Sequence, residues 1–202
     1  MKYLDEHFYH VFNRGSRSEE IFFSDANYEY FLRLIAMNAS THLVYIGAYC
    51  LMPNHYHLVL QQKENGSISK FIQSAMTSYV QAINKKYDTS GSLFQGKAKS
   101  KLIDSDENVL QVIRYVHLNP VSAKLVQAPE DWRFSDYREW IDDTFPTPSR
   151  DRKGTTLTST SYRIGNLRNA YFANAEEYRQ FVEEYRIEKQ NCKLEKFLFE
   201  EE

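Results

Sequence analysis

Two histidines separated by a single residue, His55 and His57, are the side chains of this chain whose spacing is most suited to chemistry. They belong to an aromatic and aliphatic run that predicts a β-strand over 56–60. Because side chains alternate between the two faces of a strand, both imidazoles project to one side and Tyr56 projects to the other. Two imidazoles on one face can bind a single divalent cation, although hydrogen-bonded core histidines are the commoner outcome of this spacing alone.

A tyrosine and an asparagine one helical turn apart, Tyr115 and Asn119, form a second candidate group. They fall on a polar, uncharged strip of a predicted helix, beside an apolar stripe of Val109, Val112, Ile113 and Val116. A phenol can act as a nucleophile and an amide oxygen can bind a metal ion, whereas the alternative is a boundary tyrosine packed on a sheet. Tyr79 is a competing nucleophile, but it lies in the apolar stripe of another predicted helix and is assigned to the core.

Basic residues gather between residues 84 and 101, where five lysines face one aspartate and give a local charge of +4. The lysines are Lys85, Lys86, Lys97, Lys99 and Lys101. Phe94 and Gln95 lie among them and supply a ring and an amide, the mixture that proteins use to bind single-stranded nucleic acid. A solvated lysine-rich loop is the alternative interpretation.

The elements that must position these residues alternate between strand and helix patterns. Strands are predicted over 8–12, 43–50, 56–60 and 99–103, with a turn at 13–15 and a hairpin turn at 51–54. Helices are predicted after Ser24, after Ser67 and after Asp104, each capped by that residue, and Pro120 is expected to end the third helix at Asn119. The order β, α, β, β, α, β and then a helix predicts an α+β fold with a split βαβ layer, an antiparallel sheet covered by helices on one face.

Length and composition limit the class of protein. The chain has 202 residues, 42% of them hydrophobic, and a formal charge of −2, so one sizeable core is expected and coating of nucleic acid by bulk charge is not. Cys50 and Cys192 form no CxxC pair, and no leader or membrane span is apparent, which favours a cytoplasmic protein away from membranes. We expect a domain over 1–143, a linker-like connection over 144–174 and an acidic helical tail over 175–202.

The candidate residues fall into short blocks between residue 8 and about residue 140. The blocks are Tyr9-His10-Val11 with Asn13-Arg14-Gly15, Leu51-Met52-Pro53-Asn54-His55-Tyr56-His57-Leu58, Leu93-Phe94-Gln95-Gly96, Tyr115-Val116-His117-Leu118-Asn119-Pro120-Val121, and Trp132 with Ser135 and Tyr137. In this order and at these spacings, the set resembles the REP-associated tyrosine transposases, which are single-tyrosine members of the HUH transposase and nuclease superfamily. Lys97-Ala98-Lys99 departs from the Arg-Tyr-Lys usual after the Gln-Gly step of that family, a difference that concerns base or phosphate recognition.

The resemblance implies a ferredoxin-like or RRM-like antiparallel sheet, with the histidine motif on a central strand and the nucleophile on a facing helix. It implies Tyr115 as the nucleophile, and His55, His57 and Asn119 as ligands of Mg²⁺ or Mn²⁺. It further implies cleavage and rejoining of single-stranded DNA beside a hairpin through a 5′-phosphotyrosine linkage. The residues expected to contact DNA are Arg14, Gln95, Lys97, Lys99 and Lys101. The active unit is left open between a monomer and a homodimer.

Two other functions share parts of this pattern. A module that holds a DNA or RNA hairpin without cutting it would use the same sheet and basic loop, but would not need Tyr115 and its partners. A rolling-circle replication initiator or relaxase shares the paired histidines, but such proteins tend to be larger and often carry two tyrosines. A histidine-triad hydrolase is excluded because the position for its third histidine is Val59.

Overall fold

The computed structural model describes residues 2–144 and 167–188 of the chain. The strands are β1 (Phe8–Arg14), β2 (Val44–Met52), β3 (His55–Gln62) and β4 (Lys99–Ile103). The longer helices are α1 (Asp25–Thr41), α2 (Ile68–Tyr87), α3 (Asp106–Ser122) and α6 (Ala175–Glu188), and α4 (Tyr137–Trp140) is a single turn. There are also two short 3₁₀ turns, η1 (Ser16–Ser18) and η2 (Pro129–Asp131), and residues 167–171 are helical.

The four strands form one antiparallel sheet in the order β2-β3-β1-β4. β3 therefore lies inside the sheet with a neighbour on each side, as predicted for the strand that carries the histidines. The chain order β1, α1, β2, β3, α2, β4 is the predicted split βαβ layer, and the predicted α+β class is confirmed.

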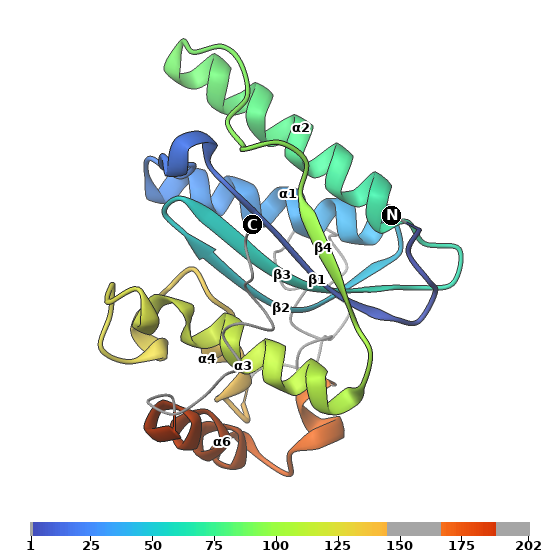
Figure 1. Cartoon of the computed structure of the whole chain (residues 1–202), viewed down its shortest axis with the longest axis vertical. Helices are drawn as coiled ribbons and strands as arrows, with labels where there is room; N and C mark the ends of the chain where they lie inside the picture. Colours follow the sequence, from blue (N-terminus) through green and yellow to red (C-terminus); the bar gives the residue numbers. More distant parts are fainter. Residues whose placement is uncertain (1, 145–166, 189–202) are drawn as a thin grey trace.

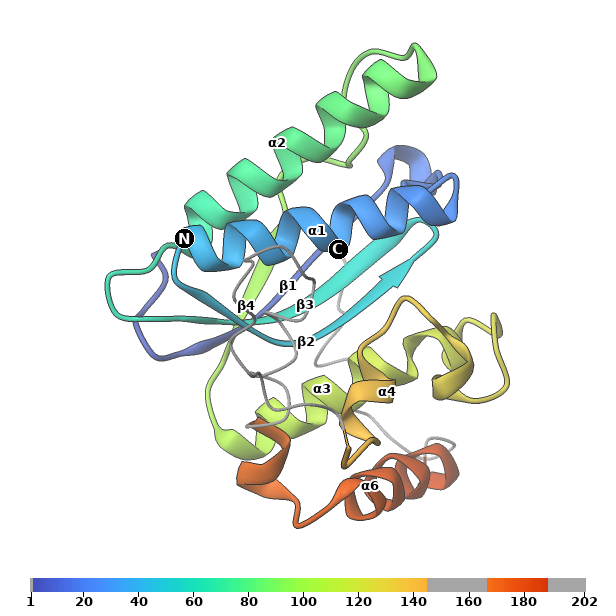
Figure 2. The ribbon, with the colours of Figure 1, turned by 180° about the vertical axis from the view of Figure 1, so that it is seen from behind.

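Alternation along the strands divides the core into two parts. Tyr9 and Val11 of β1 and Leu58 of β3 point to α1 and α2, where they pack with Phe31 and Tyr79. The opposite face packs on α3, α4 and α6 through a second set of residues, among them Ala48, Cys50, Val59, Val112 and Val116. Figures 1 and 2 show α1 and α2 on one side of the sheet and α3, α4 and α6 on the other. The prediction of helices on one face thus holds for α1 and α2 and is wrong for α3, whose own apolar stripe needs a second sheet face to cover it.

The ends of α3 differ from the prediction. Ser105, not Asp104, is the N-cap: its side chain accepts a hydrogen bond from the Asn108 backbone N–H at 3.2 Å. Pro120 lies inside the helix, which continues to Ser122. The φ of proline is helical, but residue 120 donates no backbone hydrogen bond within this turn. Asn119 therefore stays within a regular helix, one turn after Tyr115.

The predicted turn at 13–15 is also wrong, because β1 continues through Arg14 and Gly15 makes an isolated bridge to Phe94. A Cβ added at Gly15 would lie 2.0 Å from the backbone oxygen of Glu19, so only glycine fits at this close approach. As a result Arg14 is a strand residue, directly opposite His55 on β3.

Of the N-caps predicted for the first two helices, one makes a capping hydrogen bond and the other does not. Ser67 caps α2 as predicted, since its side chain accepts from the Lys70 backbone N–H at 3.2 Å. Ser24 occupies the N-cap position of α1, but its side chain makes no capping hydrogen bond.

The helix expected from about residue 175 is present as α6, and it packs on α3 through Tyr178, Val182 and Tyr185. Most of the predicted connection and the end of the acidic tail, residues 145–166 and 189–202, lie outside the described residues. The proposed division into domain, connection and tail therefore stays a prediction. Within 2–144 and 167–188, no helix is long and apolar enough to cross a membrane.

Candidate active site

The two histidines of β3 lie on the face of the sheet that α3 covers. Tyr56, between them, is fully buried on the opposite face, in the core with α1 and α2. The rings of His55 and His57 are 5.0 Å apart between centroids and nearly perpendicular, at 85°. His57 is 5% exposed, whereas His55, the first residue of β3, is half-buried. The shared face predicted from alternation is confirmed.

Helix α3 brings a tyrosine and an amide to the same place. The Asn119 Oδ1 atom lies 3.3 Å from the His55 Nε2 atom. The Tyr115 ring lies 5.5 Å from the His57 ring, edge to face at 87°. Asn119 is buried and Tyr115 is half-buried. The structure thus brings together all four residues that the resemblance implies for nucleophile and metal ligands.

Asn54, at the hairpin turn, determines which nitrogen of His55 carries its proton. The Asn54 Nδ2 atom donates to the Ser18 carbonyl at 3.2 Å, so its Oδ1 atom faces the His55 Nδ1 atom at 2.7 Å. An amide oxygen can only accept, and the proton of His55 is therefore on Nδ1. In the neutral imidazole the Nε2 atom then holds a lone pair, which it directs at Asn119.

The atoms that His55 and Asn119 turn toward each other are suited to binding a metal ion. Two acceptors, His55 Nε2 and Asn119 Oδ1, face each other, and the buried Asn119 Nδ2 atom has no hydrogen-bond partner among the described residues. Their separation of 3.3 Å is close to the roughly 3 Å between neighbouring ligands of an octahedral Mg²⁺ with bonds of about 2.1 Å. Within the described ranges no three His, Cys, Asp or Glu side chains form a metal site, so an amide would have to complete the set. His55 and Asn119 fit a divalent cation on these grounds, and His57, whose ring centroid is 5.0 Å from that of His55, lies close enough to be the third ligand.

His10 of β1 is a site residue to which the sequence patterns assigned no role. It is 1% exposed, and its Nε2 atom lies 2.9 Å from the His57 Nδ1 atom. Burial, followed by repulsion from Lys101, lowers the pKa of His10 to about 3. Burial, and to a lesser degree repulsion from His10 and His55, holds the pKa of His57 well below its ordinary value. Both imidazoles are therefore neutral at neutral pH and have lone pairs.

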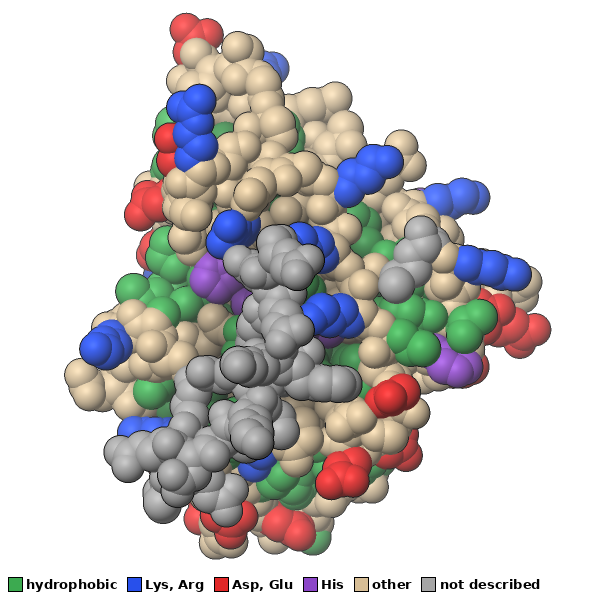
Figure 3. Space-filling model, viewed as in Figure 1, with side chains coloured by type: hydrophobic (Ala, Val, Ile, Leu, Met, Phe, Trp, Pro, Cys, Tyr) green, Lys and Arg blue, Asp and Glu red, His purple; other side chains and the backbone are tan. Residues whose placement is uncertain are grey.

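The predicted DNA-contacting residues border the histidines. Arg14 is paired with His55 across the β1–β3 ladder, and Lys101 is paired with His10 across β1 and β4. Lys99 pairs with Phe12 on the same face. Gln95 is linked to this edge, since its Oε1 atom accepts from the Arg14 Nε atom at 2.5 Å. In Figure 3, blue Lys and Arg side chains lie close to purple histidines in the middle of this face.

The remaining lysines of the basic segment divide between two places. Lys97 is exposed in the loop that leads from Gln95 into β4, close to the same edge. Lys85 and Lys86 lie in the last turn of α2, on the other layer. The basic segment is therefore split, and only its second half adjoins the histidines.

Tyr79 lies on α2, across the sheet from the histidines. It is fully buried, and its hydroxyl donates to the Ile21 carbonyl at 2.6 Å. Its assignment to the core is confirmed, and it is too enclosed to serve as the nucleophile of this site.

A buried polar network holds α3 from behind. His117 and Asp136 are fully buried, and the His117 Nε2 atom lies 2.9 Å from the Asp136 Oδ1 atom. The Tyr178 hydroxyl of α6 lies 2.5 Å from the His117 Nδ1 atom. A carboxylate oxygen accepts only, so His117 donates from Nε2 and accepts from Tyr178 at Nδ1. His117 is two residues from both Tyr115 and Asn119, so this network helps to orient them.

Arg114, beside the tyrosine, joins α3 to α6 in a second way. Its guanidinium lies 4.2 Å from the centre of the Phe181 ring and 4.1 Å from that of the Tyr185 ring. The same group donates to the Phe181 carbonyl at 3.1 Å. A buried arginine between two aromatic rings is well placed to fix the helix that carries Tyr115.

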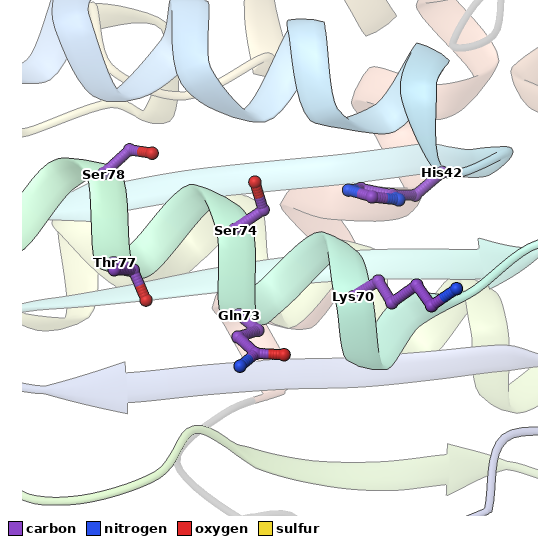
Figure 4. Close-up of a pocket in the computed structure, with 6 residues that line it drawn as sticks. All are labelled: His42, Lys70, Gln73, Ser74, Thr77 and Ser78. Atoms are coloured by element: carbon purple, nitrogen blue, oxygen red, sulfur yellow. The ribbon is translucent and has the colours of Figure 1, made fainter.

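A surface hollow of about 390 Å³ lies elsewhere, on the layer formed by α1 and α2. It is lined by His42, Lys70, Gln73, Ser74, Thr77 and Ser78 (Figure 4). Because α2 packs on the sheet face opposite to α3, this hollow is not part of the histidine site.

Comparisons with known proteins come from sequence and from structure. Residues 4–119 match the family described as "Transposase IS200 like". A protein of Haemophilus influenzae named as a REP-associated tyrosine transposase is 28% identical in an alignment of 101 residues that covers 45% of this chain and 57% of that protein. The chain thus spans less than two thirds of that relative. A REP-associated tyrosine transposase solved bound to a REP hairpin shares the fold, with a TM-score of 0.61 and 16% identity over 78% of this chain and 93% of the other.

Proposed function

Because the chain belongs to the IS200-like transposase family, we propose that it cleaves and rejoins single-stranded DNA beside a hairpin, with Tyr115 as the nucleophile. The observation that carries this proposal is the convergence of α3 on β3: Tyr115 at 5.5 Å from the His57 ring and Asn119 at 3.3 Å from His55. A structural tyrosine would not need a buried amide oxygen one turn away that faces an imidazole lone pair.

Tyr115 carries out the covalent step. Its phenol oxygen attacks the phosphorus of the scissile phosphodiester, and the bond from phosphorus to the 3′-oxygen breaks. The products are a 5′-phosphotyrosine and a free 3′-hydroxyl, on which the phenol proton ends. Since the new ester conserves the energy of the old one, attack by another 3′-hydroxyl reverses the step and rejoins strands without a nucleotide cofactor.

His55, His57 and Asn119 would hold the divalent cation, Mg²⁺ or Mn²⁺, which when bound supplies positive charge to a non-bridging phosphate oxygen. The surrounding side chains keep the ligand atoms and Tyr115 in the states and positions that this role requires. Asn54 keeps the Nε2 lone pair of His55 available, and burial keeps His57 neutral. The half-buried Tyr115 stays beside them because α3 is fixed from behind by His117 and Arg114.

The backbone of the DNA would be held along the edge that Arg14, Gln95, Lys97, Lys99 and Lys101 form. Arg14 and Lys101 are paired with His55 and His10 respectively, so phosphates on either side of the scissile one can meet a cation. An unpaired strand is flexible enough to bring its phosphate to the sheet face, which favours single-stranded DNA as the substrate.

The experiment incubates the protein with hairpin oligonucleotides labelled at the 5′ or the 3′ end, in the presence of Mn²⁺. We expect a covalent adduct that carries the 3′ label, together with a released 5′-labelled fragment that ends in a 3′-hydroxyl. The adduct should vanish with EDTA and in Tyr115→Phe. Tyr45→Phe is the matched control, because Tyr45 is likewise half-buried against the same part of the core and should form the adduct normally. Hairpin binding without an adduct under any metal would contradict the proposal and support a non-catalytic binding module.

A further inference from the structure

We propose that His10 is a positioning residue which accepts a hydrogen bond from His57 and thereby keeps the Nε2 lone pair of His57 available as a metal ligand. The inference rests on the proposed function, since it concerns how one of its metal ligands is prepared. It starts from the 2.9 Å contact between the His10 Nε2 atom and the His57 Nδ1 atom.

Two neutral imidazoles joined in this way have only two proton arrangements. If His10 donates from Nε2, the proton of His57 must be on Nε2, and neither nitrogen of His57 has a lone pair for a metal. If His57 donates from Nδ1, its Nε2 lone pair is available to a metal ion, and the proton of His10 is on its own Nδ1. A role for His57 as a ligand therefore requires His10 to be the acceptor.

The surroundings hold His10 in place for this task. It is 1% exposed and stacks on His57, with ring centroids 5.1 Å apart and an angle of 22° between the planes. Phe12 lies 4.9 Å from the His10 ring, and Tyr115 lies 6.3 Å from it, edge to face. These neighbours restrict rotation of the His10 side chain, so the direction of its Nε2 atom is set by the packing of β1.

The choice of an imidazole as acceptor suits a site for DNA. A ligating histidine commonly donates its second N–H to a carboxylate, a carbonyl or water. A carboxylate here would place a negative charge beside the scissile phosphate and beside the arginine and lysines meant for its neighbours. The imidazole of His10 can accept the hydrogen bond without adding that charge.

Two substitutions separate acceptance of a hydrogen bond from simple filling of space. His10→Gln places an amide oxygen near the position of Nε2, so it can still accept from His57. His10→Leu fills a similar volume and accepts nothing. Loss of a partner of this kind typically costs about 10–100-fold in metal affinity. We expect that loss in Mn²⁺ affinity for His10→Leu, and a change of no more than about threefold for His10→Gln. His7→Leu, an exposed position next to β1, is the matched control and should bind Mn²⁺ as the wild type does.

The first measurement uses the metal-free protein. The chain has six histidines, and spectra of ¹⁵N-histidine-labelled protein that correlate ring nitrogens with ring protons report the tautomer of each one. We expect His57 to carry its proton on Nδ1, with the signal assigned by its disappearance in His57→Gln. A proton on Nε2 of His57 in the wild type would overturn the inference.

The second measurement is Mn²⁺ binding by electron paramagnetic resonance, with thermal unfolding of each variant to confirm folding. Equal affinity in the wild type, His10→Leu and His10→Gln would overturn the inference even if the wild type forms the Tyr115 adduct. Conversely, the expected tautomer in a protein that forms no adduct would support the hydrogen-bond assignment while the proposed function fails. The two proposals can therefore fail separately.

Discussion

Asp136 provides the strongest test of how the fold supports the site. Its buried carboxylate satisfies three donors: the Tyr49 backbone N–H at 2.7 Å, the His117 Nε2–H at 2.9 Å and the Trp140 Nε1–H at 3.2 Å. These donors belong to β2, α3 and α4, so one side chain joins a strand to two helices. Asp136→Ala would leave all three donors buried without this acceptor.

Each buried donor left unsatisfied costs about 1–3 kcal/mol. With three such donors near the lower end of this range, we expect Asp136→Ala to lower the free energy of unfolding by about 3–5 kcal/mol, a large share of the roughly 5–15 kcal/mol typical of a domain. Asp136→Asn keeps one oxygen but turns an N–H₂ group toward a donor, so about 2 kcal/mol is expected.

Urea unfolding followed by circular dichroism measures these differences. Asp131→Asn is the matched control: Asp131 is exposed, and its substitution should change the free energy of unfolding by less than about 0.5 kcal/mol. Because His117 lies between Tyr115 and Asn119, Asp136→Asn should also slow adduct formation more than it weakens hairpin binding. A loss smaller than about 1 kcal/mol in Asp136→Ala would refute the importance of the network.

Two further predictions concern charge. Replacing Lys99 and Lys101 by alanine should weaken binding of a hairpin oligonucleotide and reduce the slope of log K against log salt by about one for each phosphate that no longer meets a lysine. Lys70→Ala, on the α2 layer, is the control and should change neither the affinity nor the slope. An unchanged slope in the double variant would contradict the assignment of this edge to DNA binding. Burial, and to a lesser degree the nearby charge of Asp136, raises the pKa of Glu139 to about 8. Between about pH 4.5 and pH 8 the folded state therefore keeps a proton that the unfolded state has lost, so the free energy of unfolding falls as pH rises. Thermal unfolding from pH 5 to pH 8 should therefore show Glu139→Gln gaining on the wild type as pH rises, and a constant difference would contradict the raised pKa.

Local patterns predicted most of the elements of the fold. Alternation placed His55 and His57 on one face, and helical spacing placed Tyr115 and Asn119 together and Tyr79 in the core. These predictions succeed because they depend on periods of two and 3.6 residues, which the sequence displays directly.

What could not be predicted depends on register and on contacts between distant residues. His10 and His57 are 47 residues apart and meet only because of the pairing between β1 and β3. The contact between His117 and Tyr178 spans 61 residues and requires α6 to pack behind α3. No period in the sequence reports such contacts. The order of elements also did not place α3 on the second face of the sheet, since an amphipathic helix does not reveal which of two apolar surfaces it covers; only the family resemblance implied a helix facing the histidines.

The central claim is tested most directly by identifying the residue that becomes linked to DNA. After reaction with a hairpin oligonucleotide and Mn²⁺, trypsin should cut after Arg114 and after Lys124 and release the peptide 115–124. Mass spectrometry should find the nucleotide on this peptide, at Tyr115, and the corresponding peptide of Tyr115→Phe should carry none. A nucleotide attached to any other tyrosine, or an adduct that persists in Tyr115→Phe, would contradict the assignment of the nucleophile.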